Sequence, residues 1–167
     1  MHISEDENLL NAPDDAAIMC KTEIRAGLDR SDVRRISEIE RLSFTDPWPE
    51  ISFEDIAEGK KDCIFITAYS DGEPSGFGCM YTVLDEAHIM NIAAAPDCRR
   101  RGVASMIMDA LISDAISKGV SVMMLEVRES NQAAIGLYKK YGFEEVGVRK
   151  NYYRKPTENA ILMNKDL

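Results

Sequence analysis

The stretch RRRG places three arginines and a glycine directly before an apolar segment with helical spacing. Where a strand ends and a helix begins, the first backbone N–H groups of the helix lack internal partners, and the helix dipole is positive there. An anion fits such a turn, and Gly102 lets it approach the backbone without meeting a side chain. Ala104 leaves further room, and the arginines add positive charge. The pattern predicts a turn that binds a pyrophosphate.

Two other phosphate-binding motifs are absent from this turn. Gly102 is followed by Val-Ala-Ser, so neither G-x-x-x-x-G-K-[ST] nor G-x-G-x-x-G is present. An ATPase or a Rossmann dehydrogenase is therefore not favoured. A second interpretation stays open on these residues alone: the arginines would be solvated side chains in a first helical turn, although cations are unfavourable there without an anion.

A single carboxylate, Glu126, lies within the otherwise apolar strand sequence MMLEVR. Partial burial among apolar side chains makes a carboxylate a better base near neutral pH. Glu126 is therefore a candidate general base. The alternative is a structural ion pair with Arg128, which lies two residues further along the strand and hence on the same face.

The segments around these motifs predict one α/β domain, residues 21–167, with a mixed central sheet of about seven strands and flanking helices. The expected element order is β-α-α-β-β-β-α-β-α-β-β. Helices are expected at 31–44, 52–59, 100–118 and 130–142. Strands are expected at 21–28, 62–70, 74–84, 86–96, 120–127, 143–153 and 159–167. Ser31 should cap the first helix, and Ser130 or Asn131 the last.

Charge is unevenly distributed along the 167 residues. The net charge is −9, and residues 1–20 hold five acids but no Lys or Arg, so residues 21–167 carry only −4. We expect residues 1–20 to form a mobile acidic tail. An acidic protein is also a poor partner for nucleic acid phosphates.

The N-terminal sequence lacks the basic and apolar regions of a secretory signal, and no apolar run is long enough to cross a bilayer. We therefore expect a cytoplasmic protein that does not bind membranes. The four cysteines have no C-x-x-C spacing and no histidine placed to complete a zinc set. Free thiols and no metal site are the expectation.

The glycine turn does not stand alone. R-x-x-G-x-A after a strand is the acyl-coenzyme-A signature of the GNAT N-acetyltransferases, and residues 99–104 match it. LEVRESNQAAIGLYKKYGFEEVGVRKNYY, residues 125–153, resembles the C-terminal half of RimI-type ribosomal-protein N-terminal acetyltransferases and their archaeal relatives. LDEAHIMNIAAAPDCRRRGVA resembles the preceding RimI-type segment. The resemblance covers about residues 22–165, with Arg99 and Ala104 where the family often has Gln and Gly.

This resemblance implies acetyl-CoA as the cofactor, held where two mid-sheet strands splay apart. The family places it along the backbone of the NIAAA strand and over the glycine turn. The cofactor-binding residues predicted in this way are Ile92, Ala93, Ala94, Arg99, Arg100, Arg101, Gly102, Val103, Ala104, Ser105 and Asn131. Backbone N–H groups of residues 92–94 are the candidates for polarising the thioester carbonyl.

Acetyl transfer to an amine needs a proton acceptor and a proton donor to the departing thiolate. The resemblance implies that Glu126 is the acceptor and Tyr138 the donor. An alternative for Tyr138 is a core tyrosine at helical spacing beside Ile135 and Tyr141. No His-Asp pair is available to activate Cys98, so we expect direct transfer without a covalent enzyme intermediate.

Chemistry and resemblance both point to α-amines as acceptors. At pH 7 roughly a tenth of α-amines but fewer than about one in a thousand lysines are neutral. Phe44 and Trp48 in SFTDPWP, and Tyr152 and Tyr153 on the late strand, are the predicted acceptor-binding residues. The alternative is that these aromatic residues only cover the core.

The predicted function is transfer of acetyl from acetyl-CoA to the N-terminal amine of proteins or peptides. A dedicated ribosomal substrate and a broad specificity are equally compatible with the sequence. Two alternatives stay open: acetylation of lysine side chains or polyamines, which the negative charge would attract, and a catalytically silent acyl-CoA-binding scaffold.

Overall fold

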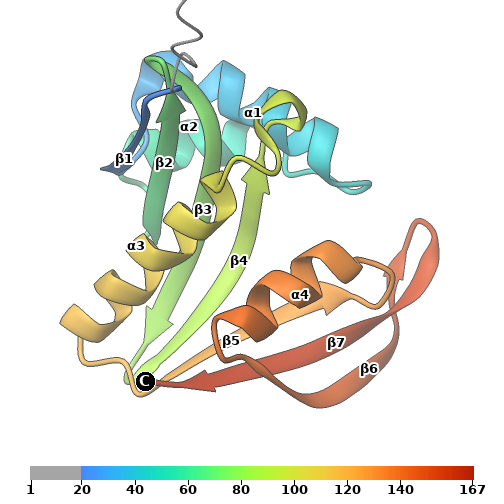
Figure 1. Ribbon diagram of the computed structural model, residues 1–167. Helices are drawn as coiled ribbons and strands as arrows, with labels where there is room; N and C mark the ends of the chain where they lie inside the picture. Colours follow the sequence, from blue (N-terminus) through green and yellow to red (C-terminus); the bar gives the residue numbers. More distant parts are fainter. Residues whose placement is uncertain (1–19) are drawn as a thin grey trace, which may run out of the picture.

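A seven-stranded sheet in the order β1-β2-β3-β4-β5-β7-β6 organises the computed structural model, which describes residues 20–167 (Figure 1). The strands are β1 Thr22–Ala26, β2 Ile64–Ser70, β3 Glu73–Val83, β4 Glu86–Ala94, β5 Val122–Arg128, β6 Glu144–Arg154 and β7 Thr157–Asp166. The helices are α1 Val33–Ser43, α2 Glu50–Ala57, α3 Val103–Ser117 and α4 Gln132–Lys140, with 3₁₀ turns at Arg30–Asp32 and Pro96–Cys98. The predicted mixed sheet and element order are confirmed. The predicted acidic tail falls on residues 1–19, outside the described residues, apart from Cys20.

The start of α1 differs from the prediction. Ser31 lies in a 3₁₀ turn, and the helix begins at Val33 without a side-chain capping bond from Asp32. The Asp32 carboxylate instead accepts a hydrogen bond from the Tyr69 hydroxyl at 2.6 Å. The Asp32 carboxylate, which could have capped the helix, is thus bound to a residue of β2 instead. At α4 the cap is Asn131, whose side chain accepts from the backbone N–H of Ala134 at 3.2 Å.

Among the strands of residues 20–167, only the neighbours β4 and β5 run parallel, and they pair over four residues of each strand. Pairing ends at Ile89 and Leu125, although β4 continues to Ala94 and β5 to Arg128. The register of β3 against β4 shifts at the same level and leaves Met90 without a partner, which is a β-bulge. Because a bulge bends its strand, it turns β4 away from β5. The splayed strand pair that the family resemblance implied is present (Figure 1).

Close packing of α3 on the sheet fixes where this helix begins. A Cβ built on Gly76 would lie 2.7 Å from the Ala93 carbonyl oxygen and 2.8 Å from Val103, and one on Gly78 would lie 2.5 Å from Ile107. Only glycine allows the helix to come this near to β3. The N-terminus of α3 is therefore held against the end of β4.

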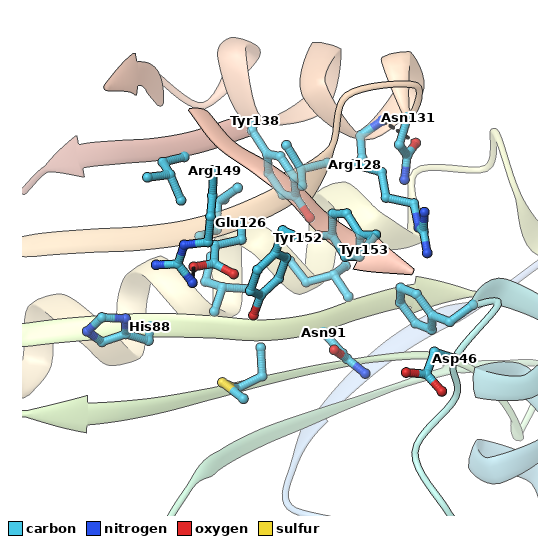
Figure 2. Close-up of a pocket in the computed structure, with 18 of the residues that line it drawn as sticks. Asp46, His88, Asn91, Glu126, Arg128, Asn131, Tyr138, Arg149, Tyr152 and Tyr153 are labelled. Carbon is cyan, nitrogen blue, oxygen red and sulfur yellow. Dashed lines mark hydrogen bonds and ion pairs between the residues drawn. The ribbon is translucent and has the colours of Figure 1, made fainter. Parts of the chain in front are cut away.

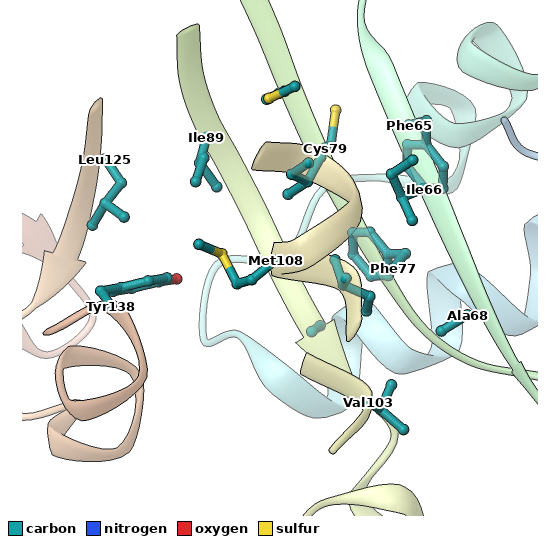
Figure 3. Close-up of a cluster of buried hydrophobic side chains, with 14 of the residues drawn as sticks. Phe65, Ile66, Ala68, Phe77, Cys79, Ile89, Val103, Met108, Leu125 and Tyr138 are labelled. Atoms are coloured by element: carbon teal, nitrogen blue, oxygen red, sulfur yellow. The ribbon is translucent and has the colours of Figure 1, made fainter. Parts of the chain in front are cut away.

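Helices α3 and α4 lie on one face of the sheet, and α1 and α2 lie on the other (Figure 1). The core between α3 and the sheet continues to Tyr138 of α4, which faces Met108 of α3 (Figure 3). Phe53, Phe65 and Phe77 form an aromatic cluster with ring centroids 5.5 to 6.4 Å apart. No helix within residues 20–167 is long and apolar enough to cross a membrane.

Candidate active site

A cavity of about 1210 Å³ opens where β4 and β5 separate (Figure 2). Its walls come from six parts of the chain: the splayed strands β4 and β5, Tyr81 of β3, the end of α1 with the loop that follows it, α4, and the hairpin of β6 and β7. The functional side chains are therefore positioned by segments far apart in the sequence. Splaying is what creates the space, because β5 would otherwise cover the edge of β4.

Glu126 lies on β5 and faces the cavity with its side chain 30% exposed. Its Oε1 pairs with Nη1 of Arg149, on β6, at 2.9 Å. The Tyr152 hydroxyl lies beside the same carboxylate, and hydrogen bonding to Glu126 raises the pKa of Tyr152. Glu126 thus has a cation on one side and a phenol on the other (Figure 2).

The alternative of a Glu126–Arg128 ion pair is wrong, because Arg128 has other partners. Its guanidinium pairs with Glu158 at 3.1 Å and donates to the Thr45 hydroxyl at 2.9 Å. The same group lies over the ring of Tyr153, 4.2 Å from its centroid. Arg128 therefore connects β5 to the loop after α1 and to the hairpin of β6 and β7.

Tyr138 on α4 is both a core residue and a residue of the cavity wall, the two placements considered from the sequence. Its ring belongs to the core and packs 5.9 Å from the ring of Phe143, while the residue also lines the cavity. Its hydroxyl points toward Tyr153 (Figure 2). Burial raises the pKa of Tyr138 to about 12, so the phenol keeps its proton at neutral pH.

All four aromatic residues predicted to bind the acceptor line this cavity. Trp48 packs against Phe53, with ring centroids 5.9 Å apart. Tyr152 and Tyr153 both reach the cavity although they are adjacent in a strand. A register shift between Arg149 and Tyr153, with Asn151 at φ +51°, removes the alternation that would turn them to opposite faces. Their role as acceptor-binding residues stays a prediction.

The glycine turn lies at the N-terminus of α3. Gly102 has φ +80°, and a Cβ built on it would meet nothing within 4 Å, so the backbone conformation favours glycine and the space above it is open. The helix begins at Val103, not at Arg100 as predicted. The arginines therefore precede the helix and do not lie in its first turn, and all three are exposed.

Some of the predicted cofactor-binding residues have side chains in the cavity, and others can contact a cofactor only through their backbone. Ile92 and Asn131 line the cavity, whereas Val103 is 1% exposed and can offer only its backbone. Beyond Ile89, no strand among the described residues pairs with β4 on the β5 side. That leaves the backbone of residues 90–94, which includes the predicted Ala93 and Ala94, as an edge along which an extended ligand can lie.

Among the polar residues at the cavity that were not singled out from the sequence are Arg149, the partner of Glu126, and the pair Glu40 and Asn91. Glu40 is fully buried in α1 and accepts hydrogen bonds from the Asn91 side chain at 2.9 and 3.1 Å. A signal for Glu40 was present, because it follows Val33 and Ile36 at the spacing of the apolar face of the helix. For Asn91 the strand sequence carries no comparable signal.

Comparison with known proteins fits this arrangement. The model of the acetyltransferase (GNAT) family matches residues 33–143. The chain belongs to the GNAT family. It is thus an N-acetyltransferase, as predicted, and GNAT enzymes use acetyl-CoA as the acetyl donor.

Curated GNAT relatives match most of the chain. The [ribosomal protein bS18]-alanine N-acetyltransferase of Salmonella typhimurium is 39% identical over 140 residues, which are 81% of this chain and 92% of the relative. The protein of the same name from Escherichia coli K12 is 37% identical over 142 residues, 83% of this chain and 93% of the relative. The predicted RimI-type resemblance is confirmed.

Solved structures agree with this GNAT assignment. The crystal structure of the ribosomal-protein-S18-alanine N-acetyltransferase from Escherichia coli is 33% identical, with a TM-score of 0.77 over 87% of this chain and 94% of that one. Ard1 from Thermoplasma volcanium is 29% identical, with a TM-score of 0.78 over 87% and 97%. NAA60 from Arabidopsis thaliana, solved with a bisubstrate analogue, is 21% identical with a TM-score of 0.79 over 87% and 98%, and shares the fold.

Proposed function

We propose that this GNAT enzyme acetylates the N-terminal α-amine of a protein, with acetyl-CoA as the donor. The observation that carries the proposal is that Glu126 and Tyr138, from different elements, meet in one cavity with the four predicted acceptor aromatics. The curated relatives are named for the N-terminal alanine of ribosomal protein bS18, and this chain spans 92 to 93% of their length. A bS18-type N-terminus beginning with alanine is therefore the first acceptor to test.

The donor side of the proposal rests on the open space above Gly102 and on the free edge of β4. The N–H groups at the start of α3 and the exposed arginines before it would hold the pyrophosphate. The backbone of residues 92–94 would hold the pantetheine arm and orient the thioester carbonyl. When bound, the cofactor supplies an acetyl group on a thiol that leaves readily.

Glu126 and Tyr138 would move the protons of the reaction. The acceptor nitrogen forms a bond to the acetyl carbon, and the proton it loses passes to the Glu126 carboxylate. Tyr138 would donate its hydroxyl proton to the thiolate sulfur that is released when the carbon–sulfur bond of the donor breaks. Tyr138 can fill this role because its buried phenol is protonated before the reaction begins.

Direct transfer fits the environment of Cys98. The thiol is buried, and burial raises its pKa, which opposes formation of the nucleophilic thiolate. The cavity also carries four basic residues at its acceptor side, Arg128, Arg149, Arg154 and Lys155. Because the acids Glu40, Asp46 and Glu126 line the same cavity, its charges are close to balanced and do not single out a polyamine acceptor, in contrast to the expectation from net charge alone.

The test compares three acceptors with the purified protein and acetyl-CoA: a peptide beginning with alanine, the same peptide with a blocked N-terminus and an internal lysine, and spermidine. Mass spectrometry should locate the acetyl group on the α-amine of the first peptide. Faster turnover of the lysine peptide or of spermidine would contradict the proposal.

Variants test the assigned residues in the same assay. Glu126→Gln and Tyr138→Phe should each lower kcat by about 10²-fold or more, since each removes a proton-transfer group. Glu144→Gln, an exposed position on β6, serves as the control and should keep full activity. Full turnover by Glu126→Gln would remove that residue from the mechanism.

A further inference from the structure

Glu40 is the one charged residue among positions 20–167 that is buried in the structure, with no exposed surface. A buried carboxylate is costly unless hydrogen bonds compensate it, whereas an apolar side chain of similar size would fill the same space at lower cost. No basic side chain pairs with Glu40 in the part of the chain that the structure describes. The identity of its hydrogen-bond donors therefore decides what the carboxylate does.

Those donors lie on two different segments of the cavity wall. The backbone N–H of Trp48, in the loop between α1 and α2, donates to Oε1 at 2.9 Å. The Asn91 amide donates to both carboxylate oxygens. Asn91 directly follows Met90, the bulged residue at which β4 turns away from β5. Glu40 thus connects the loop to the splayed strand at the point where the cavity opens.

The other end of the same loop is held from the opposite strand. Thr45, three residues before Trp48, accepts a hydrogen bond from Arg128 of β5. The loop therefore crosses the gap between the splayed strands with one attachment on each side. Phe44 and Trp48, the predicted acceptor-binding residues of this loop, lie at or beside the two attachments.

We propose that Glu40 is a positioning residue for the acceptor, acting through the Trp48 N–H and the Asn91 amide to fix the loop of residues 44–48 over the cavity. This role rests on the proposed function, because it assumes that the acceptor binds against that loop. Loss of the carboxylate should weaken acceptor binding and leave the glycine turn at the N-terminus of α3 unaffected, because none of the hydrogen bonds of Glu40 goes to that turn.

The kinetic test compares Glu40→Met with Glu40→Gln. Methionine has a similar size but cannot accept either hydrogen bond, so KM for the alanine-initiated peptide should rise about tenfold while KM for acetyl-CoA stays within about twofold. Glutamine can accept from Trp48 and, after rotation of the Asn91 amide, donate to it, so it should restore KM to within about threefold of wild type. Ile36→Ala, a buried position on the same helix, controls for general destabilisation and should leave the peptide KM unchanged.

Trp48 is the only tryptophan of the chain, so its fluorescence reports on the loop without any acceptor. Acrylamide should quench Glu40→Met more strongly than wild type, Glu40→Gln or Ile36→Ala. If Glu40→Met does not fold, Asn91→Ala removes two of the three bonds and should show the same shifts at smaller size.

Two results would overturn the role of Glu40. The first is that acrylamide quenching and KM for the peptide stay unchanged in Glu40→Met, or in Asn91→Ala if Glu40→Met does not fold. The second is that both quantities shift equally in Ile36→Ala. A wild-type protein that does not acetylate α-amines would instead contradict the proposed function. In that case the fluorescence comparison still decides whether Glu40 fixes the loop.

Discussion

The two sides of the splay are held together by different forces. On the side of β2, β3 and α3, apolar packing dominates, and almost every residue of β2 and β3 up to Met80 is buried. On the side of β5, β7 and β6, almost all of β6 is exposed, and the charged side chains of Arg128 and Arg149 connect β5 to β7 and to β6. We infer that the first region supplies most of the stability and the second positions the acceptor.

The largest expected effect is on stability in the first region. Phe77 is fully buried, stacked on Phe65 with ring centroids 5.5 Å apart and packed edge-on against Phe53 at 5.6 Å. Phe77→Ala should lower the free energy of unfolding by about 3–5 kcal/mol, measured by urea denaturation. The matched variant Tyr152→Ala, at an aromatic residue of the second region that is 44% exposed, should cost less than about 1 kcal/mol and raise KM for the peptide. Equal losses of stability would contradict the division.

The next largest expected effect is a loss of stability at alkaline pH, caused by Tyr138, which belongs both to the core and to the cavity. The pKa of Tyr138 is raised by burial from 10.0 to about 12, so between these values the unfolded chain loses a proton that the folded protein keeps. Stability should therefore be unaffected by this group below about pH 10 and fall as the pH rises toward 12, by roughly 2–3 kcal/mol. Urea denaturation from pH 8 to 11.5 should show a smaller fall in Tyr138→Phe. Curves of equal slope would mean that the phenol is not buried as the structure shows.

A conservative change at Arg128 should act on the second region alone. Lysine keeps the charge opposite Glu158 but cannot also reach Thr45 and lie flat over Tyr153, so Arg128→Lys should raise KM for the peptide by roughly tenfold. Steady-state kinetics would measure this.

The first region contains a matched control for Arg128. Arg25 on β1 also pairs with a carboxylate, Glu23 at 2.7 Å, and lies over a tyrosine ring, Tyr69 at 4.3 Å. Arg25→Lys should leave KM unchanged because Arg25 is not part of the cavity. A similar rise of KM in both variants would show that the effect is not specific to the acceptor side.

The same contrast explains which features the sequence could predict. Local signals set the elements of both regions: at the turn between β2 and β3, for example, Asp71 and Gly72 both have positive φ, as the DG signal indicates. Motifs also identified Glu126 and Tyr138 as candidates. What could not be predicted are the polar side-chain contacts between distant segments, since Arg128 and Thr45 are 83 residues apart and no local pattern connects them. The start of α1 shows a similar effect: Asp32, which directly precedes the helix, binds the Tyr69 hydroxyl 37 residues away and does not cap the helix.

The smallest expected effects are at Asn131, whose side chain both caps a helix and lines the cavity. Its Oδ1 caps α4, and because the residue lines the cavity, its Nδ2 is free to make the acetyl-CoA contact that the family resemblance predicts. Asn131→Ala should lower the free energy of unfolding by about 1 kcal/mol and also raise KM for acetyl-CoA. Serine caps a helix about as well as asparagine but has no amide to donate, so Asn131→Ser should restore stability while KM for acetyl-CoA stays a few-fold above wild type. If Asn131→Ser also restores KM, the side chain serves the helix only, and the second region contributes nothing to donor binding through this position.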